Sequence, residues 1–232
     1  GRSGNRGRCA QPCRLPYRLT CKKGLHKKQH GARYLLSPKD MCALDYMDEI
    51  AASGVRSLKI EGRMKSPEYV ATVVRIYRKY LDRAMEYGKT GDISEEDRHD
   101  LLQIFNRGGF SSGYLKGKAG SDMMCFDKPN NSGIYLGSVL SYDERSQNII
   151  VRPEDNLSAG DGIEIWTGGS DSLGGVVTSI KKAENAKARP QSYVITGESL
   201  KKACRGGLAA IGDFKGKILP GQKIYKTTDI EL

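Results

Sequence analysis

The hydrophobic pattern of the chain changes partway along, and this change constrains the fold more than any other feature. Up to about residue 104 the apolar residues recur at helical spacing, whereas from residue 132 onward they form short runs separated by glycine, proline and aspartate. Apolar residues three and four positions apart predict amphipathic helices, and short runs bounded by turn residues predict strands. We therefore expect two regions, of which the second is all β.

The first region has the element order of an α/β fold. Asp40 can cap a helix over residues 41–53, and Ser66, Pro67 and Glu68 open a longer helix that ends near Gly88. We expect the buried stripe of the longer helix to consist of Val70, Val73, Val74, Tyr77, Leu81 and Met85. Residues 55–60 form a predicted strand between the two helices, and helix, strand, helix is typical of an α/β unit.

These patterns divide the chain into residues 1–90, a helix and linker at 91–131, and a small β domain at 132–232. Seven strands are predicted in the β domain, at residues 134–141, 148–152, 162–166, 174–180, 192–196, 208–213 and 223–227. Short strands with recurrent turns favour a small closed barrel. The turns at residues 160–162 and 220–223 resemble those of translation-factor β-barrels.

The amino-terminal loop is strongly basic and lacks hydrophobic periodicity. Residues 1–40 hold eleven lysines and arginines against Asp40 alone, in a chain of net charge +11. A cluster of this kind is typical of a protein that binds a phosphate-bearing partner, most often nucleic acid. The alternative is a solvated basic arm, or a basic hairpin with strands at 17–21 and 32–37.

Two of the six cysteines are spaced to share a ligand. The chain is too long for a disulfide-stapled mini-protein and shows no secretory signal, so we expect reduced thiols. Cys9 and Cys13 lie in a glycine-rich loop and can face one metal or cluster, which would recruit Cys21, Cys42 or cysteines outside this chain. Cys125 and Cys204 are expected to be inert packing residues.

Glu61 and Arg63 are the catalytic candidates. They follow the predicted strand at 55–60, and in α/β sheets and barrels the chemistry lies beyond the carboxyl ends of strands. The alternative is a Glu-Arg pair that only supports its loop.

Several classes of protein are disfavoured. No apolar run approaches the roughly 20 residues that span a bilayer, and no signal peptide is evident, so a cytoplasmic protein without membrane contact is expected. Of the three histidines, His26 and His30 lack the glutamate of a zinc-protease helix, and no nucleophile-base constellation is evident. A peptidase is therefore the weaker interpretation.

Three ordered motifs resemble the collagenase-like peptidase family U32. They are RSGNRGRCAQPCRLPY at residues 2–17, LSPKDMC at 36–42 and SLKIEGRMKS at 57–66, the last followed by Tyr69-Val70-Ala71. FNRGGF at 105–110 and PNNSG at 129–133 resemble the extension of the longer members.

The resemblance implies a TIM-like α/β barrel with a four-iron four-sulfur cluster. Better-understood members hydroxylate a 23S rRNA cytidine or the wobble uridine of tRNA and depend on prephenate, so the expected partner is RNA rather than DNA. Cys9 and Cys13 match two cluster ligands, with Cys42 as the alternative fourth ligand, and the other ligands and most barrel strands are expected upstream of residue 1. The expected substrate-binding residues are Arg2, Asn5, Arg6, Gln11, Arg14 and Lys59. A peptidase and a non-catalytic RNA-binding module remain the alternatives.

Overall fold

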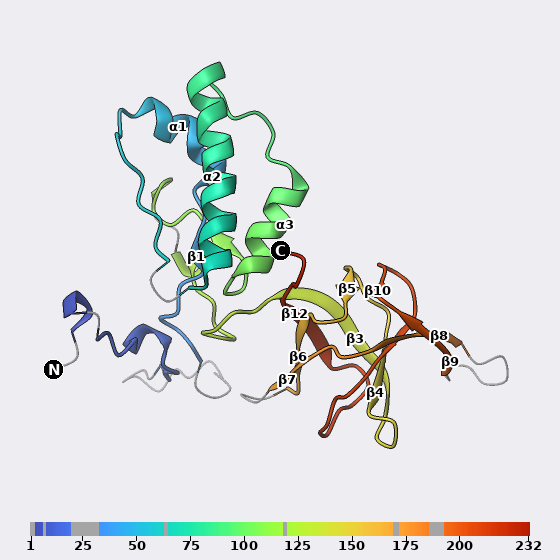
Figure 1. Cartoon of the computed structure of the whole chain (residues 1–232). Coiled ribbons are helices and arrows are strands. Elements are labelled where there is room, and N and C mark those ends of the chain that lie inside the picture. The colour runs from blue at the N-terminus through green and yellow to red at the C-terminus, as the bar shows by residue number, and fades with distance from the viewer. Residues whose placement is uncertain are drawn as a thin grey trace. The chain divides into compact units, whose positions relative to one another are not determined.

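The computed structural model describes residues 3–6, 8–19, 33–62, 65–117, 120–168, 172–185 and 193–232. It consists of two compact units, residues 1–132 and residues 133–232, and each has its own hydrophobic core. Helices dominate the first unit and strands the second (Figure 1). Among the described helices, none is both long and apolar enough to cross a membrane.

In the described part of the first unit, three α-helices form the framework. They are α1 (Met47–Ala52), which follows the 3-10 turn η3 (Leu44–Tyr46), α2 (Pro67–Tyr87) and α3 (Glu95–Ile104). The hydroxyl of Ser66 caps α2 and that of Ser94 caps α3, and Gly88 ends α2 with a φ of 72°. The longer helix was thus predicted well, whereas the helix predicted at 41–53 is shorter because its first residues form a strand and η3.

The predicted stripe of α2 is only partly correct. Val73 and Tyr77 pack in the core, but Val70, Val74 and Met85 are 43%, 44% and 72% exposed. The covered face carries Ile76, Tyr80 and Ala84 instead. Helix α2 therefore has apolar residues on two sides. In the described structure α1 and α3 pack against the side that carries Ile76 and Tyr80, whereas the side that carries Val70 and Val74 is exposed.

A buried carboxylate fastens α3 to α2. Asp97 is 3% exposed and accepts hydrogen bonds from Lys79 Nζ at 2.5 Å and from the hydroxyls of Tyr80 and Ser94, each at 2.7 Å. Burial alone would raise the pKa of Asp97, but these three donors outweigh it and lower the pKa to about 2. The ionised carboxylate is therefore part of the folded state.

The strand predicted at residues 55–60 is wrong. These residues form no strand, and Val55, Leu58 and Ile60 are 56%, 42% and 37% exposed. The ladder described in this unit joins β1 (Asp40–Met41) in parallel to β2 (Phe110–Ser111). A strand needs a hydrogen-bonding neighbour, and the described residues supply none to 55–60, so the α/β barrel is not seen here.

The second unit is an antiparallel β fold, as predicted. Its main sheet has the order β7-β6-β12-β3-β4-β11-β8-β9, with strands β3 (Ile134–Asp143), β4 (Asn148–Val151), β6 (Gly162–Trp166), β7 (Ser172–Val176), β8 (Ile180–Asn185), β9 (Tyr193–Leu200), β11 (Ala209–Ile211) and β12 (Lys223–Thr228). A second pair joins β5 (Leu157–Ser158) to β10 (Lys202–Ala203).

Two details of the β domain differ from the prediction. Among the described strands the pairing runs from β7 to β9 and does not close into a ring. The strand predicted at 174–180 is divided between β7 and β8, because Val177 and Ser179 leave the ladder to bond Asp161 and Gly212. Inward-facing residues of the strands, including Leu136, Ile165 and Ile224, form one core.

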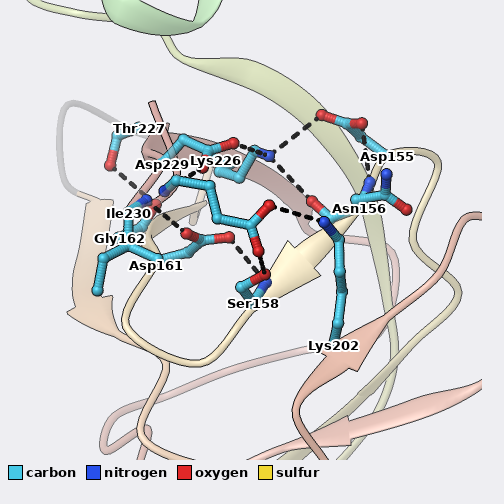
Figure 2. A network of polar contacts seen from close by, with 11 residues as sticks. Asp155, Asn156, Ser158, Asp161, Gly162, Lys202, Lys226, Thr227, Asp229 and Ile230 are labelled. Atoms are coloured by element: carbon cyan, nitrogen blue, oxygen red, sulfur yellow. Dashed lines mark hydrogen bonds and ion pairs between the residues drawn. The ribbon is translucent and has the colours of Figure 1, made fainter.

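A buried lysine, Lys226, lies near the carboxyl end of strand β12 (Figure 2). The Lys226 side chain is 2% exposed, and its Nζ lies 2.7 Å from Asp229 and 3.4 Å from Asp155 and donates to the carbonyl of Asn156 at 2.9 Å. Beside it, the buried Asp161 accepts from the backbone N–H groups of Ser158 and Ile230. These bonds fasten the segment after β12 to residues 155–161.

We expect Asp97→Asn to lower the free energy of unfolding at neutral pH by about 2 kcal/mol, the value of lowering a carboxyl pKa from 3.8 to about 2. Because the folded-state pKa is depressed, this contribution is full above pH 4 and is lost as the pH falls toward 2. Urea titrations followed by helical circular dichroism at several pH values would measure it. Asp82→Asn, which removes an exposed pair with Arg78, is the control and should change stability by less than about 0.5 kcal/mol.

We expect Lys226→Met to destabilise the second unit by about 3 kcal/mol, because it leaves Asp155 and Asp229 without their buried counter-charge. The matched control is Lys202→Met, whose ion pair with Glu231 is exposed and should contribute less than about 1 kcal/mol. Urea midpoints followed by Trp166 fluorescence would measure both. Equal effects of the two substitutions would show that the buried lysine has no special role.

Candidate functional site

The cysteine loop has a defined backbone. Cys13 lies in the 3-10 turn η2 (Pro12–Arg14), and Gln11 enters this turn in the left-handed conformation with a φ of 52°. The Gln11 N–H donates to Cys9 Sγ at 3.3 Å, and the Tyr17 hydroxyl donates to the carbonyl of Pro12 at 2.7 Å. Both thiols are exposed. Cys9 and Cys13 have the side chains that can ligate a metal or an iron-sulfur cluster.

Arg14 connects this loop to the next motif. Its Nη1 donates to the hydroxyl of Ser37 at 2.6 Å and to the carbonyl of Pro38 at 2.7 Å. Ser37 is completely buried. Partial burial, together with the nearby charge of Arg107, lowers the pKa of Arg14. The residue after Cys13 is therefore held in place rather than free in solvent.

Arg107 is brought to the same place by the pairing of β1 with β2. Its Nη1 lies 2.6 Å from a carboxylate oxygen of Asp40, and its Nε donates to the carbonyl of Pro129 at 2.9 Å. The following residue, Gly108, has a φ of 70°, and a Cβ there would lie 2.8 Å from the sulfur of Cys125. The turn after Arg107 therefore requires glycine.

Lys65 is the third cation of this region. It lies over the ring of Phe105, which also has the Arg107 guanidinium 4.6 Å from its centroid and the edge of Tyr69 against it. Burial, reinforced by the charges of Arg107 and Arg14 and opposed by Asp40, lowers the pKa of Lys65 to about 8.

We call Arg14, Lys65 and Arg107 the cationic cluster. Asp40 is a carboxylate that acts on all three, since it pairs with Arg107 and opposes the lowering of the pKa values of Arg14 and Lys65. Three cations around one carboxylate leave an excess of positive charge, which a phosphate or carboxylate group can neutralise through charge-assisted hydrogen bonds.

The other predicted binding residues are more exposed. Asn5 and Arg6 belong to the 3-10 turn η1 (Gly4–Arg6) at the surface. Lys59 Nζ lies 2.9 Å from Glu61, and this ion pair is open to solvent. The carbonyl of Glu61 accepts a hydrogen bond from Tyr69 at 3.4 Å, which ties the loop to the aromatic residues beside Lys65.

Some predicted residues lie outside the described part of the chain. These are Arg2, Arg63, Cys21, His26 and His30. The hairpin predicted around residues 22–31 lies largely there too, although Tyr17 and Arg33 form an antiparallel bridge at its base.

Cys42 has surroundings of its own. It is half-buried, its sulfur accepts a hydrogen bond from Tyr77 at 3.6 Å, and its N–H donates to Ser111. In the described residues no three His, Cys, Asp or Glu side chains gather as a metal site, and a cluster takes four ligands, so Cys9 and Cys13 alone would not complete one. Cys125 is buried, as expected for a packing residue, whereas Cys204 is exposed, contrary to expectation.

Sequence reasoning missed Lys65, Phe105 and Arg107 as members of the site. We interpreted residues 107–132 as a linker because of their glycine content. The signal that could have identified Phe105 and Arg107 is an arginine two positions after an aromatic residue in FNRGGF, inside a segment with few apolar residues.

Comparison with known proteins identifies the family. The model of Peptidase family U32 matches residues 1–124. The tRNA hydroxylation protein P1 of Bacillus subtilis is 33% identical over 171 residues, which cover 71% of this chain and 40% of that protein. A collagenase of Porphyromonas gingivalis is 33% identical over 230 residues, covering 97% of this chain and 51% of that protein.

The chain is also similar to two further proteins. The 23S rRNA 5-hydroxycytidine C2501 synthase of Escherichia coli is 34% identical over 173 residues, covering 71% of this chain and 25% of that protein. The carboxyl-terminal domain of a protein described as a U32 peptidase from Geobacillus thermoleovorans has 18% identity and a TM-score of 0.32, covering 40% of this chain and 91% of that domain. The chain thus spans about half or less of these curated relatives. Since the family model matches more than half of its residues, the chain belongs to Peptidase family U32.

Proposed function

We propose that this chain is part of an RNA base hydroxylase that forms 5-hydroxycytidine in rRNA or 5-hydroxyuridine in tRNA. The observation that carries the proposal is the position of Arg14, which directly follows Cys13 and is anchored beside Arg107. A thiol pair therefore adjoins the cationic cluster. The names of the relatives, two of which concern tRNA and rRNA hydroxylation, support the choice of RNA.

A four-iron four-sulfur cluster is the cofactor that we propose for the cysteine loop. When bound, it would supply the electron-transfer chemistry that hydroxylation of a pyrimidine requires. Cys9 and Cys13 would be two of its ligands, and the Gln11 N–H would remain bonded to the sulfur of Cys9. A cluster of this type takes four sulfur ligands, so the longer protein or Cys42 would supply the others.

The cationic cluster would bind the anionic part of the substrates. Arg14 and Arg107 each use one or two donors within the fold and retain others for an RNA phosphate or for the carboxylates of prephenate, our proposed co-substrate. An anion beside Lys65 would raise the pKa of this lysine from about 8 and keep it charged. Glu61 and Arg63 remain our proposals for the catalytic residues, with Arg2, Asn5, Arg6, Gln11 and Lys59 as further substrate contacts.

A peptidase is the second candidate function. The match to a collagenase over 97% of the chain favours it. Against it stands the chemistry of the chain, which has three histidines and, among the described residues, no cluster of metal-binding side chains. Incubation of the full-length protein with gelatin would test this alternative directly.

We expect a strain that lacks the full-length protein to lose one hydroxylated pyrimidine from its rRNA or tRNA, measured by mass spectrometry of nucleosides. The intact gene should restore the modification, whereas Lys65→Met should restore less than about a tenth of it, since a charge-assisted contact contributes a factor of this order. Lys116→Met, which breaks an exposed pair with Glu49, is the control and should restore it fully. An unchanged set of nucleosides in the deletion strain, together with gelatin cleavage, would favour the peptidase.

We expect Cys9→Ala and Cys13→Ala to lower the iron content of the full-length protein reconstituted anaerobically, with loss of visible absorption, because each removes one cluster ligand. Cys204→Ala is the matched control, since Cys204 is also exposed but lies in the second unit. Comparing Cys42→Ala with these variants would decide whether Cys42 is a ligand. Full iron content in both loop variants would contradict the assignment.

A further inference from the structure

The second unit has a row of aromatic side chains that the proposed active site does not use. Tyr135 of β3, Tyr225 of β12 and Trp166 of β6 come from three adjacent strands, and Tyr225 lies directly opposite Tyr135 in the ladder. The ring centroids of Tyr135 and Tyr225 are 5.6 Å apart, and those of Tyr225 and Trp166 are 4.2 Å apart and stacked. Their neighbours Leu136, Ile165 and Ile224 point into the core, so the row lies on the opposite face of the sheet, where its three residues are partly buried.

A pocket of about 310 Å3 adjoins the Tyr135 end of this row. Its walls include Tyr135, Ser138, Leu140, Arg152, Glu154 and Arg205. Backbone hydrogen bonds hold these walls together, from Glu154 to Leu136 at 2.8 Å and from Gly206 to Pro153 at 2.7 Å. Gly137 allows the close approach, since a Cβ there would lie 2.9 Å from the carbonyl oxygen of Arg152. The pocket is thus built by the fold itself.

The charges around the pocket are mainly positive. Arg152 and Arg205 are both exposed and both line the pocket. Lys223 is exposed as well and lies opposite Ser138 in the ladder. Glu154 is the acidic residue of the lining. A lining that holds one tyrosine ring and two arginines complements a ligand that has both a planar ring and a negative charge.

We propose that this pocket binds one nucleotide of a single-stranded RNA segment, with the base against Tyr135 and the adjacent phosphates on Arg152 and Arg205. The inference rests on the proposed RNA function and deepens it, because it adds a contact for RNA outside the amino-terminal unit. A nucleobase offers a π-face to the tyrosine, and phosphates accept paired hydrogen bonds from arginine. An acidic peptide would satisfy the arginines but leave the tyrosine ring without a stacking partner.

The test is fluorescence anisotropy of a labelled single-stranded RNA of mixed sequence, about 12 nucleotides long, with the full-length protein at fixed salt concentration. The charge variant is Arg152→Ala/Arg205→Ala, and its charge-matched control is Arg145→Ala/Lys217→Ala, at exposed positions outside the pocket. The stacking variants are Tyr135→Leu and Tyr135→Phe, of which the second retains a ring. The control for them is Tyr114→Leu in the first unit, where the side chain is 72% exposed.

We expect Tyr135→Leu to weaken RNA binding by about fivefold or more, because a base stacked on an aromatic side chain contributes at least this factor. We expect about the same loss from Arg152→Ala/Arg205→Ala, because it removes charge-assisted hydrogen bonds to phosphate. Tyr135→Phe and the two controls should bind as the unchanged protein does. The melting temperature of each variant shows whether it is folded, and Tyr135→Phe separates loss of the ring from loss of the hydroxyl bond to Ser138.

Three outcomes would overturn the proposal: wild-type affinity in the pocket variants, equal weakening in the charge-matched control, or competition by polyglutamate as effective as by unlabelled RNA. The proposed function fails separately, when the deletion strain retains every hydroxylated pyrimidine. If pocket variants lose RNA binding in that case, the RNA-binding pocket stands without the hydroxylase. If hydroxylation depends on the protein but the pocket variants bind RNA normally, only the pocket proposal is refuted.

Discussion

The candidate site depends on the ion pair between Arg107 and Asp40. A two-residue parallel ladder joins the segments that carry them, and such a short ladder contributes few hydrogen bonds. The two side chains are 19% and 25% exposed, so water and salt weaken their attraction less than that of the exposed pairs. Asp40 also moderates the mutual repulsion of Arg14, Lys65 and Arg107. Without this carboxylate, the repulsion among the three cations would act against the bonds of Arg14 to Ser37 and Pro38 and the contact of Lys65 with the ring of Phe105.

The local parts of the fold were predictable from the sequence, and the parts set by distant contacts were not. Ser66, Pro67 and Gly88 mark the ends of α2, and alternating residues mark β6. The covered side of α2 depends on which elements pack against it, so the apolar pattern alone wrongly predicted that Val70 and Val74 are buried. Residues 55–60 have the composition of a strand, but a strand also requires a partner. The two-residue strands β5 and β10 are too short to leave a pattern.

The same distinction applies to the site. Cys9, Cys13 and Arg14 are adjacent in the sequence, so their association is visible there. Lys65 and Arg107 are brought to Arg14 by the pairing of β1 with β2 and by the ring of Phe105, which no local pattern reveals. The lysine within β12 is another example, because a strand with a lysine normally turns it toward solvent. Lys226 is buried because Asp155, Asn156 and Asp229 converge on it from two loops.

The segment after β12 is bonded to three other parts of the second unit. Asp229 neutralises the buried ammonium, the N–H of Ile230 bonds Asp161, and Glu231 pairs with Lys202. Detachment of residues 229–231 would break all of these contacts at once and take the carboxylate of Asp229 away from the buried ammonium. The access of a protease to this unit should therefore be decided by how often residues 229–231 detach, rather than by the strength of the hydrophobic core.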